Sequence, residues 1–128
     1  MPEKKLNINI LVVDDEENIR FLYKEELEDE GYTVTLAANA EEALKKIVEK
    51  QPDLITLDIK MPGMNGIEFL RKLKEENRNI PVVLCSAYGS YKQDFRVWAS
   101  DAYVVKSADL RELKQTIKEI LGGMPQKT

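Results

Sequence analysis

The chain has 128 residues, the size of one ordinary domain, and carries 19 Lys and Arg against 23 Asp and Glu, for a formal net charge of −4. This acidic balance excludes the broad basic surface with which proteins hold nucleic acids or anionic membranes. The absence of histidine excludes Ser-His-Asp and Cys-His catalysis and every metal site that needs imidazole.

The first third of the chain has the pattern of a strand, a helix and a second strand. Residues 8–13 are almost continuously apolar, as in a central strand that is covered on both faces. A helical period follows and ends near Gly31, which we expect to be a C-cap. Residues 33–37 then alternate between apolar and polar side chains, which is typical of an edge strand.

The middle of the chain repeats this order. Asn39, followed three residues later by Glu42, resembles a capping box and predicts a helix that ends near Pro52. Residues 54–57 are the third predicted strand, and the turn-rich stretch 61–66 follows them. The helix and strand signals therefore continue to alternate.

The remaining elements alternate in the same way. They are a helix that begins near Ile67, a strand at 82–85, a short helix at about 91–98 and a strand at 102–105. A last helix follows, which Asp109 and Glu112 cap and which ends at residues 122–125. Five strand-helix units with apolar strands imply a parallel sheet with helices on both faces. The predicted fold is a flavodoxin-like three-layer α/β sandwich, with strand order 2-1-3-4-5 and five helices.

No repeat or linker interrupts this alternation, so we expect one domain at 8–121 between an N-terminal tail at 1–7 and a C-terminal tail at 122–128. No apolar stretch approaches 18 residues, and the N-terminus lacks the apolar core of a signal peptide. The single Cys85 lies in an apolar run and is expected to be a small buried hydrophobe. These features predict a soluble cytoplasmic protein.

Polar residues stand where the central strands end. Asp14 and Asp15 follow the first strand, Asp58 the third, Ser86 the fourth and Lys106 the fifth. The carboxyl ends of parallel strands meet at one edge of the sheet, and neighbouring strands lie ~4.8 Å apart. The three carboxylates are therefore expected to share one small pocket.

Such a cluster needs positive charge, because uncompensated carboxylates raise one another's pKa. A set of oxygen ligands without His or Cys suits a hard cation, and a small, partly hydrated site suits Mg²⁺ better than Ca²⁺. Lys106 supplies a second, fixed positive charge. A carboxylate that can attack, a cation and an ammonium together favour chemistry on a phosphoryl group.

Four sequence strings in this order resemble the receiver domain of two-component response regulators over residues 8–121: I-L-V-V-D-D-E-E, L-D-I-K-M-P-G-M-N-G, L-C-S-A-Y and Y-V-V-K. Each string is weak by itself, but four in order, each at the end of a predicted strand, are specific. The stretches D-I-K-M-P-G-M-N-G-I-E and S-A-Y-G are similar to stand-alone phosphorelay receivers of the sporulation type.

The resemblance implies a role for each residue of the pocket. Asp58 is the expected phosphoacceptor in a Mg²⁺-dependent reaction. Asp14, Asp15 and Asp58, with the carbonyl of Lys60, are the expected metal ligands. Lys106 is expected to pair with the phosphoryl group.

The resemblance also implies a switch and a control on the lifetime of the phosphate. Ser86 would bind the phosphoryl group through its hydroxyl, and Tyr103 would turn inward as Ser86 moves. Lys60 and Tyr88 each lie two residues beyond a site residue, and they would flank the phosphoryl group. Tyr88 is expected to shield it from water and to slow autodephosphorylation.

The expected partners are a sensor histidine kinase or a histidine phosphotransfer protein as donor, and a downstream protein target. Neither nucleic acid nor membrane is an expected partner, and we expect a monomer or a weak phosphorylation-dependent dimer. The chain would assist its own phosphorylation and dephosphorylation without being a turnover enzyme. A single-domain regulator is the first interpretation, and a receiver fragment of a longer regulator is the alternative.

Two departures from the family pattern lead to further expectations. Many receivers place proline in a cis bond after the lysine of the fifth strand, whereas Ser107 stands here. Because a cis bond without proline costs ~3–4 kcal/mol, we expect a trans bond. The segment between Ser86 and Lys106 is also shorter than is common, so the fourth helix is expected to be short or mobile.

Two other classes share part of this pattern. A small phosphatase with an aspartyl nucleophile would use Asp, Lys, Ser and Mg²⁺, but such enzymes usually show D-x-D-x-T after the first strand, where this chain has D-D-E-E-N. A flavin-binding module shares the topology but needs a phosphate loop rich in Ser, Thr and Gly, which is absent here. Neither alternative explains Lys106 and Ser86 together.

Overall fold

Five strands form one parallel sheet in the order β2-β1-β3-β4-β5. The computed structural model describes residues 8–76, 79–87 and 100–122. Its strands are β1 (Asn9–Val13), β2 (Thr33–Ala37), β3 (Leu54–Asp58), β4 (Val82–Ser86) and β5 (Ala102–Val105). The predicted sheet, its strand order and the edge position of residues 33–37 are confirmed.

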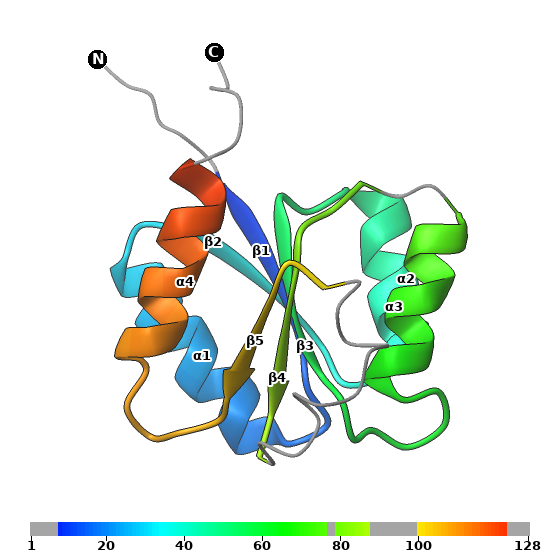
Figure 1. Cartoon of the computed structure of the whole chain (residues 1–128), viewed down its shortest axis with the longest axis horizontal. Coiled ribbons are helices and arrows are strands. Elements are labelled where there is room, and N and C mark those ends of the chain that lie inside the picture. The colour runs from blue at the N-terminus through cyan, green and yellow to red at the C-terminus, as the bar shows by residue number, and fades with distance from the viewer. Residues whose placement is uncertain (1–7, 77–78, 88–99, 123–128) are drawn as a thin grey trace.

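Helices cover both faces of this sheet (Figure 1). Among the described residues they are α1 (Glu17–Asp29), α2 (Ala40–Glu49), α3 (Gly66–Glu75) and α4 (Arg111–Gly122). Figure 1 shows α1 and α4 on one side of the sheet and α2 and α3 on the other. This is the predicted three-layer α/β sandwich.

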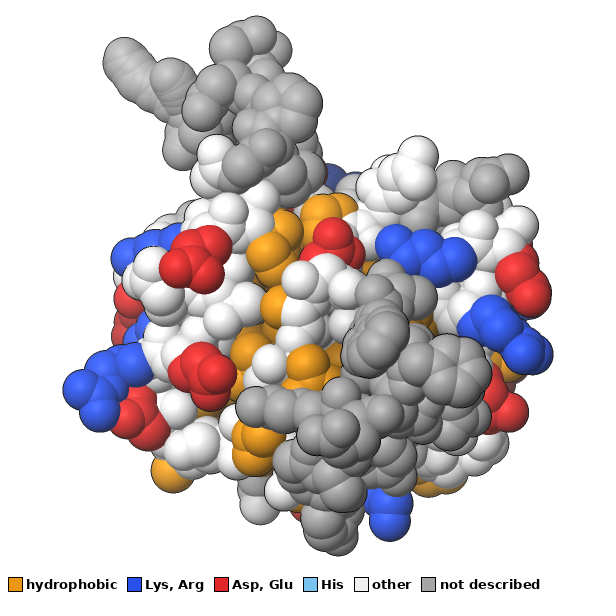
Figure 2. All heavy atoms as spheres, viewed as in Figure 1, with side chains coloured by type: hydrophobic (Ala, Val, Ile, Leu, Met, Phe, Trp, Pro, Cys, Tyr) orange, Lys and Arg blue, Asp and Glu red, His pale blue; other side chains and the backbone are white. Residues whose placement is uncertain are grey.

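The two faces of the sheet bury separate apolar clusters. Along β1, Leu11 and Val13 pack into the cluster of α2 and α3, whereas Ile10 and Val12 pack into the cluster of α1 and α4. Alternating side chains of a strand point to opposite faces, so a strand covered on both sides is apolar throughout. Figure 2 shows hydrophobic side chains along the middle of one face of the molecule, with charged side chains on both flanks.

The helix starts follow the predicted capping chemistry with one difference. The Asn39 side chain accepts a hydrogen bond from the Glu42 amide at 2.9 Å, but the Glu42 carboxylate accepts from the Ala38 amide rather than from Asn39. The complete capping box lies at α3, where Asn65 and Glu68 satisfy each other's backbone amides. The first turn of α3 is therefore firmly fixed.

Two aspartates form hydrogen bonds with the first residues of β1 and β4, at the amino edge of the sheet. The Asp53 amide donates to the Asn9 carbonyl, and the Asp53 carboxylate accepts from the Asn9 amide, both at 2.8 Å. Asp101 makes the same pair of bonds with Val82, at 2.8 and 2.9 Å. Each aspartate thus satisfies both backbone groups of the first residue of a neighbouring strand.

The described residues contain four helices, one fewer than the five predicted. The segment at about 91–98 falls within residues 88–99, outside the described residues.

The structure also tests predictions about a helix cap, a peptide bond and the end of the last helix. Gly31 follows α1 with φ +99°, as a C-terminal cap requires. The described part of the chain has no cis peptide bond, so Lys106–Ser107 is trans as predicted. The last helix runs to Gly122, one residue beyond the expected end of the domain. None of the helices within the described ranges is long and apolar enough to cross a bilayer.

Candidate functional site: an acidic pocket at the carboxyl edge of the sheet

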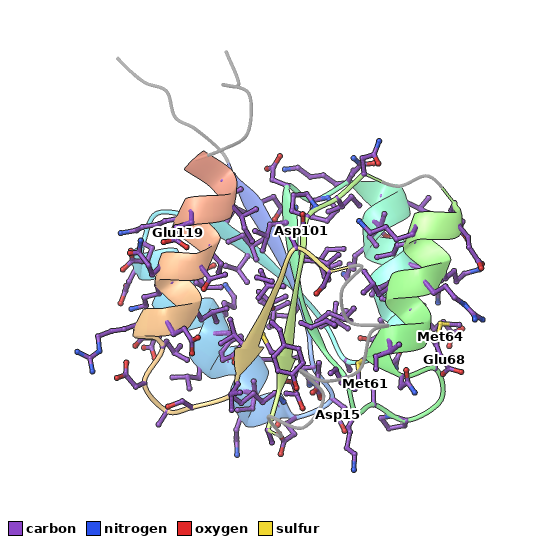
Figure 3. All side chains as sticks on the ribbon, in the orientation of Figure 1. Asp15, Met61, Met64, Glu68, Asp101 and Glu119 are labelled. Atoms are coloured by element: carbon purple, nitrogen blue, oxygen red, sulfur yellow. The ribbon has the colours of Figure 1, made fainter. Side chains whose placement is uncertain are left out.

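The carboxyl ends of β1 and β3 bring three carboxylates together. Asp14 and Asp58 are 2 % and 5 % exposed, whereas the neighbouring Asp15 is exposed. One oxygen from each of the three lies within 4.8 Å of the others. Figure 3 shows Asp15 at this edge and Asp101 at the opposite end of the sheet. Asp14, Asp15 and Asp58 thus lie together at the carboxyl edge, at a spacing that suits a metal site.

Lys106 enters the same pocket from the end of β5. Its ammonium lies 2.7 Å from Asp14 Oδ2 and 3.2 Å from Asp58 Oδ1, and 3.8 Å from Glu16 Oε1. The Lys106 amide donates to the Ser86 carbonyl at 2.7 Å, which extends the β4–β5 ladder by one residue. This backbone bond directs the lysine over the carboxylates.

Asp14 is held in place by bonds to its main chain and its side chain. Its amide donates to the Ala37 carbonyl at 3.1 Å, and its carbonyl accepts from Arg20 Nη1 at 2.7 Å. Its Oδ1 accepts from the Glu16 amide at 2.9 Å, and its Oδ2 pairs with Lys106. Both carboxylate oxygens of Asp14 thus have protein partners. The bond from Arg20 could not be predicted from the sequence, because the pattern of a helix does not show which backbone group an arginine on it will reach.

The electrostatics of the pocket depend on burial. Burial and the neighbouring charge of Asp14 raise the pKa of Asp58 to about 7, against the opposing effect of Lys106. Burial acts to lower the pKa of Lys106, but its bond to Asp14 and the charges of Asp14 and Asp58 outweigh burial, so that this pKa is raised. The lysine therefore stays charged at neutral pH.

Charge and donor chemistry together show that the pocket can hold a metal ion. When all three carboxylates are ionised, they and the Lys106 ammonium carry a net charge of −2, which one divalent cation would balance. The donors from Asp14, Asp15 and Asp58 are all carboxylate oxygens, which hard cations prefer. The role of the Lys60 carbonyl as a further ligand stays a prediction.

Two buried side chains near the carboxylates, Cys85 and Tyr23, are uncharged. Cys85 is buried, as predicted, and burial raises the pKa of its thiol to about 12. Its hydrogen-bond partner Tyr23, which lies on α1, is 3 % exposed, and burial raises the pKa of this phenol as well. Both side chains stay neutral at physiological pH.

An open groove of about 560 Å³ lies beside the pocket, between the loop after β1 and the loop after β3. Asp15 and the exposed Lys60 line it, with Met61 as part of an apolar floor. Figure 3 shows Asp15 and Met61 at the same end of the molecule. Lys60 therefore lines the same groove as Asp15, and its effect on the lifetime of the phosphate stays a prediction.

The two predicted switch residues are on adjacent strands. Ser86 ends β4 and is 1 % exposed. Tyr103 lies in register with Leu84 and packs, partly buried, against the cluster under α2 and α3. Tyr88, the predicted shield, lies outside the described residues.

Residues 10–118 match the family model for the response regulator receiver domain. The chain belongs to this family. It is 37% identical over 118 residues to sporulation initiation phosphotransferase F of Bacillus subtilis, covering 91% of this chain and 95% of that relative. It also matches longer transcriptional regulators of Bacillus subtilis, of which it spans about half the length.

Solved structures agree with this assignment. The response regulator TrrA of Thermotoga maritima, in complex with Mg²⁺ and BeF, is 46% identical, with a TM-score of 0.84, and the match covers 90% of this chain and 99% of that one. TrrA in complex with the histidine kinase ThkA gives 46% identity and a TM-score of 0.83, over 91% and 99% of the two chains. The chain is thus a receiver domain of two-component phosphorelay signalling.

Proposed function

We propose that Asp58 accepts a phosphoryl group from a phosphohistidine, in a reaction that needs Mg²⁺. The observation that carries this proposal is the position of the Asp58 carboxylate, which is buried, 3.2 Å from the Lys106 ammonium and clustered with Asp14 and Asp15. Nucleophile, fixed positive charge and metal ligands thus meet at one point. The similarity to a protein solved with Mg²⁺ and BeF supports the choice of metal.

Each residue then has a chemical task. An Asp58 oxygen forms the new O–P bond while the P–N bond to the donor imidazole breaks, and the electron pair of that bond returns to the ring nitrogen. Lys106 pairs with the phosphoryl oxygens, and the Ser86 hydroxyl donates a hydrogen bond to one of them. Mg²⁺, held by Asp15 and Asp58 with Asp14 acting through water, would neutralise the developing negative charge.

The donor in this proposal is a sensor histidine kinase or a histidine phosphotransfer protein, and the receiver passes the signal to a downstream protein. The similarity to a receiver solved with its histidine kinase, and to a sporulation phosphotransferase, supports a protein donor. The module changes state instead of turning over a substrate. A monomer, or a weak dimer formed on phosphorylation, remains our expectation for its assembly.

The decisive experiment is labelling by a radioactive phosphodonor, either acetyl phosphate or a phosphorylated histidine kinase. We expect acid-labile phosphate on the parent in Mg²⁺ and none in EDTA. Asp58→Asn should abolish the label, and Asp29→Asn, an exposed aspartate on α1, should leave it unchanged. Undiminished labelling of Asp58→Asn would reject Asp58 as the phosphoacceptor.

A further inference from the structure

The first residue of α3 touches the backbone of the proposed phosphoacceptor. A Cβ atom built on Gly66 would lie 2.1 Å from the carbonyl oxygen of Asp58, and 2.9 Å from both the Asp58 carbonyl carbon and Ile59 Cα. Real Cβ atoms essentially never come within 3.0 Å of such atoms. Only glycine lets α3 begin this close to the end of β3.

Other bonds hold the start of the helix at this point. The Gly66 amide donates to the Ile59 carbonyl at 2.8 Å. Asn65 accepts from the Glu68 amide at 2.9 Å, and Glu68 accepts from the Asn65 amide at 3.1 Å. The first turn of α3 is thus fixed on one side by its capping box and on the other by the chain that carries Asp58.

We propose that Gly66 is a positioning residue for phosphoryl transfer, through which the start of α3 sets where the Asp58 carboxylate stands against Lys106 and Asp15. This inference rests on the proposed function of Asp58. An added methyl group must move one backbone away from the other by at least 0.9 Å, from 2.1 Å to 3.0 Å. A misplacement of about 1 Å in a reacting group can slow a reaction by ~10²-fold.

Two other glycines provide matched controls, because they lack this contact. Gly63 lies in the same loop with φ +76°, and Gly31 follows α1 with φ +99°. Nothing lies within 4 Å of a Cβ at either position. Alanine at Gly63 or Gly31 therefore strains the backbone and lowers stability without displacing Asp58.

The experiment compares Gly66→Ala, Gly63→Ala and Gly31→Ala for Mg²⁺-dependent labelling by acetyl phosphate and for Mg²⁺ affinity by NMR titration. We expect Gly66→Ala to be labelled ~10–100-fold more slowly and to bind Mg²⁺ more weakly, with both controls within ~2-fold of the parent. Labelling of Gly66→Ala that falls only in proportion to its folded fraction, with parental Mg²⁺ affinity, would overturn the proposal.

A second pair of variants covers the case in which Gly66→Ala does not fold. Asn65→Ala removes the cap of α3, and Asn39→Ala removes the equivalent cap of α2; each asparagine accepts from a backbone amide at 2.9 Å. We expect labelling to slow several-fold for Asn65→Ala and to stay parental for Asn39→Ala. Equal rates for the two would contradict the positioning role.

The same experiment distinguishes failure of the positioning role of Gly66 from failure of the proposed function of Asp58. Loss of label in Asp58→Asn together with normal labelling of Gly66→Ala and Asn65→Ala rejects the positioning role alone. Persistent labelling of Asp58→Asn rejects the proposed phosphoacceptor itself.

Discussion

The Lys106 ammonium lies 2.7 Å from Asp14 and 3.2 Å from Asp58, so one lysine is shared between a carboxylate proposed to act in metal binding and the proposed phosphoacceptor. A phosphoryl group on Asp58 would offer the lysine more negative charge than the bare carboxylate does. We therefore expect phosphorylation to shift Lys106 from Asp14 toward Asp58.

The stability of the metal-free protein should fall as pH rises from about 4 to about 7. The pKa of Asp58 is raised from 3.8 to about 7, so in this window the folded state binds more protons than the unfolded state. The loss should be on the order of 1–3 kcal/mol. Urea unfolding in EDTA at pH 5 and pH 8 measures it. Asp58→Asn should remove most of this slope, and parallel profiles for variant and parent would contradict the assignment.

Mg²⁺ should stabilise the folded protein at pH 8, because a cation relieves the repulsion among the three carboxylates. At a concentration of 100 times Kd the gain should be about 2.7 kcal/mol. Asp15→Asn, which changes the exposed member of the cluster, should weaken Mg²⁺ binding with little effect on unfolding in EDTA. Thermal unfolding against Mg²⁺ concentration tests this, with Asp29→Asn as the control. Equal Mg²⁺ responses of the two variants would remove Asp15 from the site.

The switch between Ser86 and Tyr103 should respond to beryllofluoride, a mimic of the phosphoryl group. We expect the Tyr103 ring signals in NMR spectra to move when Mg²⁺ and beryllofluoride are added, and to stay in place in Ser86→Ala. Partner affinity should then change by ~5–150-fold, the usual range of coupling between two sites. If the partner binds both forms equally well, the chain is a passive phosphate relay.

The lifetime of the acyl phosphate should depend on Tyr88, which the sequence places two residues beyond Ser86. Tyr88→Ala should hasten autodephosphorylation, because water then reaches the phosphorus more easily. The release of phosphate from labelled protein, after the donor is removed, measures this rate. A rate equal to that of the parent would end the shielding hypothesis.

The sequence by itself determined where the strands end and where the pocket lies. Strands buried on both faces need apolar residues throughout, so the polar residues that interrupt them at Asp14, Asp58 and Lys106 mark the strand ends. Parallel strands have their carboxyl ends at one edge, and this rule brings together residues far apart in the chain. The short segment at about 91–98 had no such long pattern, and the fifth helix predicted there is not among the described elements.

Only the tertiary structure decided how these residues meet. That Lys106 is shared between two carboxylates, that Arg20 holds the Asp14 carbonyl and that Gly66 touches Asp58 all depend on distances between elements that no local pattern specifies. Burial also decides the raised pKa of Asp58, because desolvation depends on all the groups around a carboxyl rather than on its neighbours in sequence. The sequence shows which side chains can form the site. Their packing decides their protonation states and the distances between them.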